Sequence, residues 1–248
     1  MRSHLIILGT GTCQITKRRM ASSVLLDLGE LKVVYDFGHG ICQRILEAGY
    51  KNNDINHIIL SHFHPDHFSD LIPVLHASSY SKTESRTHDL NIYGPVGAKK
   101  LINGLVGLVR PGELILQKQY NVSVREITEN TIEINGFTFD FIELPPREPI
   151  ENRGLRFEIN RRIYAITGDS KYHQQEIDFL KNAFLGIINS GVLTDEEIVD
   201  LAVKTQVQKL VCSHLYRELD REKLQKEAER QGYKGEIIVG EDLMSFEL

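Results

Sequence analysis

Few cysteines and the lack of a long apolar run narrow the classes of protein to which this chain could belong. Its 248 residues include three cysteines, Cys13, Cys42 and Cys212, with no CxxC pair. This odd number argues for free thiols in a reducing compartment and against a disulfide framework. No apolar run reaches the roughly eighteen residues of a membrane helix, and no charged-then-apolar segment opens the chain. We therefore predict a cytoplasmic protein that neither spans a membrane nor is exported.

The bulk composition is that of an ordinary globular domain. Hydrophobic residues make up 41% of the chain and charged residues 25%, and we find no internal repeat or Pro/Gly/Ser-rich linker. We therefore expect residues 1–248 to form one domain. The net charge of −5 gives no general attraction to a polyanion, so extended nucleic-acid binding is not expected.

Metal-binding side chains are concentrated in one short segment. His62, His64, Asp66 and His67 fall within six consecutive positions, directly after the apolar run at residues 57–60. Neutral imidazole suits zinc and its first-row neighbours, and a carboxylate adds charge and can hold a second ion. The alternative is a polar turn whose histidines are surface residues. The density of ligands favours a metal site.

The expected local structure supports a site. The run at 57–60 is typical of a buried strand, and apolar spacing predicts a helix over 66–77 that begins near Pro65. The cluster then lies between the carboxyl end of a strand and the start of a helix, where open α/β sheets place their ligands.

On these residues the chain resembles a known family. The pattern His62-x-His64-x-Asp66-His67 is similar to the HxHxDH motif of the metallo-β-lactamase-fold hydrolases. Further segments resemble, in the right order, motifs of the ribonuclease Z-like branch: 8–12 (LGTGT), 22–26 (SSVLL), 36–40 (DFGHG), 166–170 (ITGDS) and 210–214 (LVCSH). The resemblance therefore spans almost the whole chain.

Periodicity alone predicts an α/β protein, and the resemblance implies a more definite architecture. It implies the α/β (α+β) metallo-β-lactamase fold, a four-layer αββα sandwich with two sheets face to face and helices outside. We expect strands near 4–8, 22–28, 31–36, 57–60, 91–95, 122–144 (two or three), 155–167 (two), 184–189, 208–213 and 235–239. We expect helices near 39–49, 66–77, 95–107, 173–182, 194–205 and 220–231.

The resemblance also implies six ligands for two divalent metal ions. They are His62 and His64 at site 1, Asp66, His67 and His214 at site 2, and Asp169 bridging the two. We expect Zn, with Mn or Fe as alternatives. Taken alone, Asp169 could form only an Asx-turn, and His214 could be a satisfied histidine at a strand end or a helix cap. The HxHxDH pattern upstream favours the ligand interpretation of both.

One departure from the family concerns site 1. The family has a further histidine six residues before the glycine of a strand start, which here is Gly154, and that offset falls on Glu148. Glu148 could replace the imidazole as an oxygen ligand. Alternatively, site 1 is weakened and one metal is held tightly at site 2, or Glu148 is only a solvated loop carboxylate. We favour Glu148 as a ligand.

A second departure concerns the substrate. Val192 falls where ribonuclease Z enzymes carry a histidine, and the arginine that follows their last ligand is shifted, with Arg217 nearest. No insertion corresponds to the arm with which those enzymes hold transfer RNA. The basic triplet 17–19 could bind a phosphate or form an ordinary solvated loop.

These observations predict a metal-dependent hydrolase that uses a metal-activated water. We expect a ribonuclease Z-like phosphodiesterase, with Asp66 as the catalytic residue and a small phosphodiester, nucleotide or RNA end as substrate. Two alternatives remain: a carboxylic ester, lactone or thioester hydrolase, and a degenerate member that binds metal or ligand without turnover. No membrane partner is expected, and a homodimer is one option for the assembly.

Overall fold

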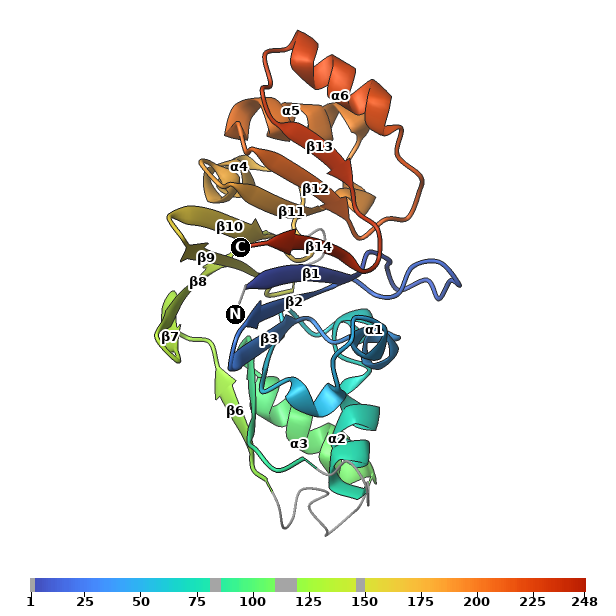
Figure 1. Cartoon of the computed structure of the whole chain (residues 1–248), viewed down its shortest axis with the longest axis vertical. Coiled ribbons are helices and arrows are strands. Elements are labelled where there is room, and N and C mark those ends of the chain that lie inside the picture. Colours follow the sequence, from blue (N-terminus) through green and yellow to red (C-terminus); the bar gives the residue numbers. More distant parts are fainter. Residues whose placement is uncertain (1–2, 81–85, 110–119, 146–149) are drawn as a thin grey trace.

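Two seven-stranded mixed sheets form the centre of the protein (Figure 1). A computed structural model describes residues 3–80, 86–109, 120–145 and 150–248. The first sheet has the order β14 (Met244–Glu247), β1 (His4–Gly9), β2 (Ser23–Leu28), β3 (Leu31–Tyr35), β4 (His57–Ile59), β5 (Leu90–Gly94) and β6 (Val122–Glu126). The second has the order β13 (Glu236–Val239), β12 (Lys209–Ser213), β11 (Leu185–Asn189), β10 (Arg162–Ile166), β9 (Arg153–Ile159), β8 (Phe137–Glu143) and β7 (Thr131–Ile134).

Helices accompany each sheet in chain order. They are α1 (Ile41–Glu47), α2 (Leu71–Tyr80) and α3 (Ala98–Val109) with the first sheet, and α4 (Gln174–Leu180), α5 (Asp195–Thr205) and α6 (Arg221–Arg230) with the second (Figure 1). The described residues also form three short 3-10 helices: η1 (Asn52–Asp54), η2 (Pro65–His67) and η3 (Ser190–Val192).

Alternation along β1 shows how the layers are built. Leu5 and Ile7 point into a core shared with residues of the second sheet, such as Phe139 and Tyr164. Ile6 and Leu8 point the other way, into a core with residues of α1 and α2. A third core packs α4, α5 and α6 against the second sheet. Because successive side chains of a strand face opposite ways, each sheet is covered on both faces. The predicted αββα sandwich is confirmed.

The predicted helix over 66–77 begins later than expected. Residues 65–67 form the separate turn η2, and α2 starts only at Leu71. The interruption has a tertiary cause, because the backbone N–H of Phe37 donates to the carbonyl of His67 (2.7 Å) and the N–H of Asp70 donates to the carbonyl of Phe37 (3.1 Å). These bonds hold the ligand segment against the end of β3 and prevent a continuous helix.

The last strand, β14, was not predicted. It pairs antiparallel with β1, so that His4 faces Glu247 and Ile7 faces Met244. Figure 1 shows this red strand beside the blue β1, although the two strands lie far apart in the sequence. Its four residues are too few and too mixed to mark a strand without the partner edge. Within the ranges given above, no helix has the length and apolar character needed to cross a bilayer.

Candidate metal centre

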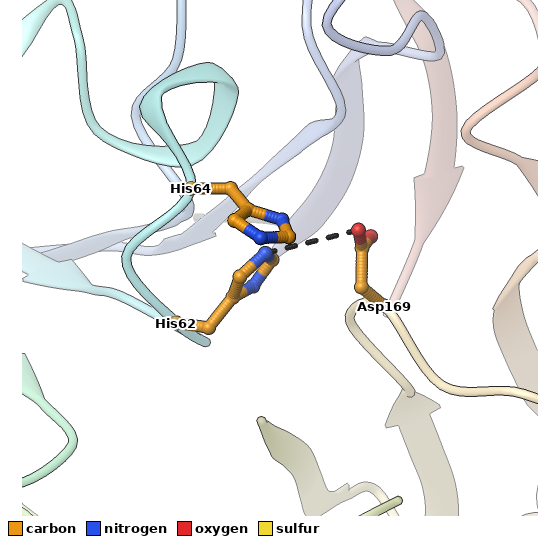
Figure 2. A group of neighbouring side chains, drawn as sticks. All are labelled: His62, His64 and Asp169. Carbon is orange, nitrogen blue, oxygen red and sulfur yellow. Dashed lines mark ion pairs between the residues drawn. The ribbon is translucent and has the colours of Figure 1, made fainter. Parts of the chain in front are cut away.

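The six predicted ligand side chains come from three places that lie at one edge of the sandwich. Four of them, from His62 to His67, lie on the segment that leaves β4 and enters η2. Asp169 follows β10, and His214 follows β12. Figure 2 shows the side chains of His62 and His64 on one loop segment, with the carboxylate of Asp169 facing them from a second segment. Two sheets therefore contribute to a single cluster.

The cluster consists of two triads, and within each triad the three ligand atoms lie within 4.8 Å of one another. The first triad is His62, His64 and Asp169, and the second is Asp66, His67 and His214. The carboxylate of Asp169 lies between them. Its Oδ2 is 3.7 Å from Nε2 of His62, and its Oδ1 is 3.3 Å from Nε2 of His214. The family resemblance implies a bridging role for Asp169, and that role stays a prediction.

Hydrogen bonds to the far nitrogens set the orientation of two imidazoles. Oδ2 of Asp36 accepts hydrogen bonds from Nδ1 of His67 (2.8 Å) and from the hydroxyl of Ser61 (2.8 Å). Because Ser61 donates its one proton to Asp36, its oxygen accepts from Nδ1 of His62 at 2.9 Å. Both imidazoles then present an Nε2 lone pair to the cluster. Asp36 and Ser61 thus support the two imidazoles, whereas the Ser213 hydroxyl contacts that of Ser22.

Unsatisfied buried atoms show that these residues fit a cation. Nε2 of His62, His67 and His214 and Oδ1 of Asp169 are all buried. Among the described residues, none forms a hydrogen bond to any of these four atoms. Buried polar atoms without partners are costly, and a bound cation would satisfy these four, which converge on one place.

The electrostatics of the cluster agree with this explanation. Burial lowers the pKa of His67, but Asp169, Asp36 and Asp66 outweigh it and raise that pKa to about 10. Burial would raise the pKa of Asp66, yet the His214 and His67 imidazoles bring it down to about 2. Burial and the neighbouring imidazoles hold the pKa of His62 well below its usual range. The carboxylates that raise the pKa of His67 would likewise attract a divalent cation, and that cation would take the place of the second proton on the ring.

Asn152 positions Asp169 and was missed in the sequence. It is fully buried, its Oδ1 accepts from the backbone N–H of Asp169 (3.0 Å), and its Nδ2 donates to the carbonyl of Thr167 (3.0 Å). Gly168 has a φ of 60°, and a Cβ there would lie 2.4 Å from Oδ1 of Asn152. The glycine therefore permits both the turn and the close approach of the amide. A buried asparagine has no distinctive sequence pattern, so nothing in the sequence marked it.

A cavity of about 660 Å³ opens onto the ligand cluster. Its described lining comprises Cys13, His64, Pro65, Asp66, Ile150, Asp169, Asn189, Gly191, Val192, His214 and Tyr216. Tyr216 and Asn189 were not among the predicted site residues, although each lies at or just after the end of a strand. Val192, at the position of the missing histidine, forms part of the wall.

Other predicted groups lie elsewhere. Glu148 falls outside the described residues. In the basic triplet, Arg18 bonds to Glu218 and Glu241, and Arg19 is buried against Thr10 and the carbonyl of Gly240. These two arginines therefore hold the loop to the C-terminal part of the chain, and the phosphate-binding interpretation of the triplet is not supported. Arg217 pairs with Asp195 at the start of α5.

Similarity to known proteins agrees with this geometry. Residues 3–221 match the family described as Anti-Pycsar protein Apyc1. The chain belongs to this family. This chain is also similar to the ribonuclease Z of Streptococcus thermophilus (strain ATCC BAA-491 / LMD-9), with 35% identity over 132 residues. That match covers 52% of this chain and 41% of the ribonuclease Z, so the chain spans about two fifths of the relative.

Solved structures show where this Apyc1 family member belongs by fold. The metallo-β-lactamase fold protein YhfI from Bacillus subtilis superposes with a TM-score of 0.80 at 21% identity, over 100% of both chains. A diphosphatase from the PhnP family superposes with a TM-score of 0.75 at 18% identity, over 100% of this chain and 98% of the other. The predicted metallo-β-lactamase fold and ribonuclease Z-like character are confirmed.

Proposed function

We propose that this protein is a metal-dependent phosphodiesterase acting on a small phosphodiester or nucleotide. The observation that carries the proposal is the convergence of two ligand triads on Asp169 at the floor of an open cavity. Relatives support the chemistry, because the names ribonuclease Z and diphosphatase denote enzymes that cleave bonds of phosphate groups. The cytoplasmic location and the homodimer stay predictions.

Two divalent ions would be held by the six clustered side chains. His62 and His64 would hold the first, Asp66, His67 and His214 the second, and Asp169 both. When bound, such ions supply a nucleophile from water at neutral pH and offset the charge of a phosphoryl group. Glu148 remains our proposal for a further oxygen ligand at the first site.

The protein's own groups orient the reaction. Asp66 lines the cavity, and its low pKa of about 2 keeps the carboxylate ionised at neutral pH. It can therefore accept a hydrogen bond from the attacking water and hold it in place. Asp36 and Ser61 keep the His67 and His62 rings oriented with Nε2 toward the ligand cluster. Asn152 fixes the backbone of Asp169, so the carboxylate stays between the triads.

One observation favours the rival chemistry of carboxylic ester, lactone or thioester hydrolysis. The described part of the cavity lining contains no lysine or arginine that could pair with a phosphate. If the ions do not supply that positive charge, an uncharged ester would be the better substrate. The fold itself accommodates either reaction.

Metal content and a matched substrate pair decide between these functions. The as-purified protein should contain roughly two ions per chain, and after loading with Zn, Mn or Fe it should cleave bis(4-nitrophenyl) phosphate in preference to 4-nitrophenyl acetate. A preference for the acetate would establish the rival ester chemistry. One ion or none, with neither substrate cleaved, would indicate a binding protein.

Asp66 provides the matching variant test. We expect Asp66→Ala to lower turnover by a factor of roughly 100 or more, since the residue acts at the site and not in a hydrophobic core. Asp140→Ala is the control, because that carboxylate contacts Thr131 on β7 and lies outside the cavity lining. Both variants should retain the cooperative thermal transition of the parent. Turnover of Asp66→Ala within tenfold of the parent would remove Asp66 from the mechanism.

A further inference from the structure

The ring of His214 is held differently from two other rings of the ligand cluster. Asp36 and Ser61 orient those two rings through their Nδ1 atoms. Nδ1 of His214 is buried, and it has no hydrogen-bond partner among the described residues. His214 also has a φ of 54°, a left-handed conformation that is unusual for a residue with a side chain. The position of this ring therefore depends on the contacts that hold its backbone.

Hydrogen bonds hold the backbone on both sides of His214. The hydroxyl of Ser190 donates to the carbonyl of Ser213 (2.7 Å), the residue before it. The backbone N–H of Leu215, the residue after it, donates to the carbonyl of Thr10 (2.8 Å). Thr10 is fully buried and immediately follows β1 of the first sheet. The backbone beside His214 is thus tied to the other sheet through Thr10.

Asp242 in turn fixes Thr10. It lies between β13 and β14, and its side chain is only 6% exposed. Its Oδ1 accepts hydrogen bonds from the backbone N–H (2.9 Å) and the hydroxyl (2.7 Å) of Thr10. Its Oδ2 accepts from the N–H of Met20 (2.8 Å) and from Nε of Arg44 (3.1 Å). One carboxylate therefore joins three segments, and Thr10 cannot shift without breaking bonds to it.

Arg19 closes this network on the side of β12. Its guanidinium is buried, and Nη1 donates to the Thr10 hydroxyl (2.6 Å) and to the carbonyl of Gly240 (2.7 Å). The N–H of Gly240 donates to the carbonyl of Cys212 on β12 (2.9 Å). A Cβ at Gly240 would lie 3.2 Å from Cγ2 of Thr10, so the two residues pack closely. The network thus returns to the strand that leads to His214.

We infer that Asp242 is a positioning residue for the second triad, acting through the Thr10 carbonyl on the backbone of His214. Asp242 lies outside both triads and is not part of the described cavity lining, so its effect on a metal ion is indirect. A purely structural role would cost stability and leave the metal affinity of the folded protein unchanged. The inference rests on the proposed metal centre, and it does not depend on the identity of the substrate.

Zinc affinity separates these two roles. Competition with a chromophoric chelator measures it, at a temperature at which each variant is fully folded. We expect Asp242→Asn to bind zinc about tenfold more weakly, because an amide cannot accept all four hydrogen bonds that the carboxylate receives. Asp27→Asn is the control, since that carboxylate is also largely buried but accepts from Gly29 and Tyr50. It should bind zinc within about twofold of the parent.

A second background shows whether the effect passes through His214. His214→Ala removes that imidazole, and we expect Asp242→Asn to change the zinc affinity of this variant by no more than about twofold. A network that only loosened the whole fold would weaken zinc binding by the same factor with and without the imidazole. The comparison therefore isolates the coupling between the two residues.

Amide exchange locates the change within the backbone. In zinc-loaded protein the Leu215 amide should exchange at least about fivefold faster in Asp242→Asn than in the parent, because its acceptor Thr10 is less firmly held. The Ile127 amide, which donates to the carbonyl of Gly94 (2.8 Å), is the reference and should keep its rate. Heteronuclear NMR measures both rates in one experiment.

Substitutions at Thr10 keep the test decisive if Asp242→Asn does not fold. Thr10→Val removes the hydroxyl that donates to Asp242 and keeps the bulk, and we expect it to weaken zinc binding about three- to tenfold. Thr10→Ser keeps the hydroxyl and should bind zinc within about twofold of the parent. In the His214→Ala background neither change should have an effect. Equal affinities of the two Thr10 variants would overturn the inference.

The remaining outcomes are equally decisive. The inference is overturned if Asp242→Asn binds zinc like the parent, if Asp27→Asn loses as much affinity, or if the loss persists without the His214 imidazole. An unchanged exchange rate at Leu215, or an equal change at Ile127, also overturns it. A parent that binds no zinc overturns the metal centre and the inference together. If the zinc affinities follow the expected pattern but no phosphodiester is cleaved, the inference stands and the proposed function fails. If a phosphodiester is cleaved and the pattern is absent, the proposed function stands and the inference fails.

Discussion

Asp36 belongs to neither ligand triad, yet two of their members depend on it. Its Oδ2 accepts from Nδ1 of His67 and from the Ser61 hydroxyl, and its Oδ1 accepts from the Ser61 backbone N–H at 2.7 Å. It does this from a left-handed backbone conformation with a φ of 62°, which non-glycine residues seldom adopt. Such strain persists where the surrounding contacts require it.

Replacing this carboxylate should therefore loosen the metal centre without removing a ligand. We expect Asp36→Asn to lower metal affinity by roughly 10- to 100-fold, because the amide cannot accept from both donors as a carboxylate does. Competition with a chromophoric chelator measures the affinity. Asp140→Asn, on β8, is the control and should bind metal like the parent. Equal affinities in the two variants would mean that Asp36 serves only the local backbone.

Glu176 is a second residue whose environment has a measurable consequence. It lies in α4, it is fully buried, and neither of its carboxyl oxygens has a hydrogen-bond partner among the described residues. Burial raises its pKa from the ordinary value of 4.5 to about 8. Between those two pH values the folded protein keeps a proton that the unfolded chain loses. The free energy of unfolding therefore falls as pH rises through that window.

Glu176→Gln should remove this loss of stability. We expect the variant and the parent to differ little below about pH 4.5, and the variant to be more stable by on the order of a few kcal/mol above about pH 8. Urea unfolding at a series of pH values measures the difference. Glu222→Gln, on the exposed start of α6, should follow the parent throughout. If the free energies of unfolding of the parent and of Glu176→Gln differ by the same amount at every pH, the pKa of Glu176 is not raised in the folded protein.

Among the elements, the short turn η3 controls how the last ligand is presented. It lies between β11 and α5, and a Cβ at Gly191 would stand 2.1 Å from the backbone oxygen of His214. The end of β12 can therefore approach η3 only because residue 191 is glycine. His214 itself has a φ of 54°, so its backbone is already in an unfavourable region.

Gly191→Ala should displace His214 and weaken the second triad. We expect lower metal content after dialysis and a loss of about 1–3 kcal/mol in the free energy of unfolding, because the clash is with backbone and cannot be relieved by a side-chain rotation. Gly104→Ala is the matched control. Its added methyl meets open space on helix α3, so stability should stay level or rise slightly. Full metal content in Gly191→Ala would show that the strand end can shift at no cost to the site.

The sequence predicts elements well where the pattern is local. The strands expected within 122–144 and 155–167 are present, with Asn135 and Gly136 between β7 and β8 and residues 160–161 between β9 and β10. The start of α2 and the strand β14 could not be predicted, because both depend on hydrogen bonds to distant segments. The same division holds at the site. Dense metal-binding residues such as His62 and His64 are visible in the sequence, whereas Asn152 and Tyr216 matter only through their neighbours in space.

At the scale of the whole molecule, the ligand cluster joins the two sheets. The segment His62–His67 follows β4 of the first sheet, whereas Asp169 and His214 follow strands β10 and β12 of the second. A bound cation would therefore connect both layers of the sandwich. A ligand that binds only the folded state stabilises it by about 4 kcal/mol when its concentration is a thousand times its dissociation constant.

Removal of metal should consequently lower the thermal stability of the entire fold. We expect excess chelator to reduce the Tm by about 5–15 °C in a single transition. Asp169→Ala, which removes the residue shared by both triads, should have a Tm that responds little to chelator. Differential scanning calorimetry of both proteins with and without chelator makes the comparison. If chelator leaves the Tm of the parent unchanged, bound metal does not contribute to the stability of the protein.

The pairing of β14 with β1 also bears on how the protein is made. During synthesis β1 emerges before the other described strands, and β14, which covers its outer edge, emerges after them. At cellular rates of translation the interval is on the order of ten to fifty seconds. Throughout that time the nascent first sheet exposes the unpaired backbone of β1, to which another growing chain could add a strand. The first sheet is therefore completed last at the strand with which it began.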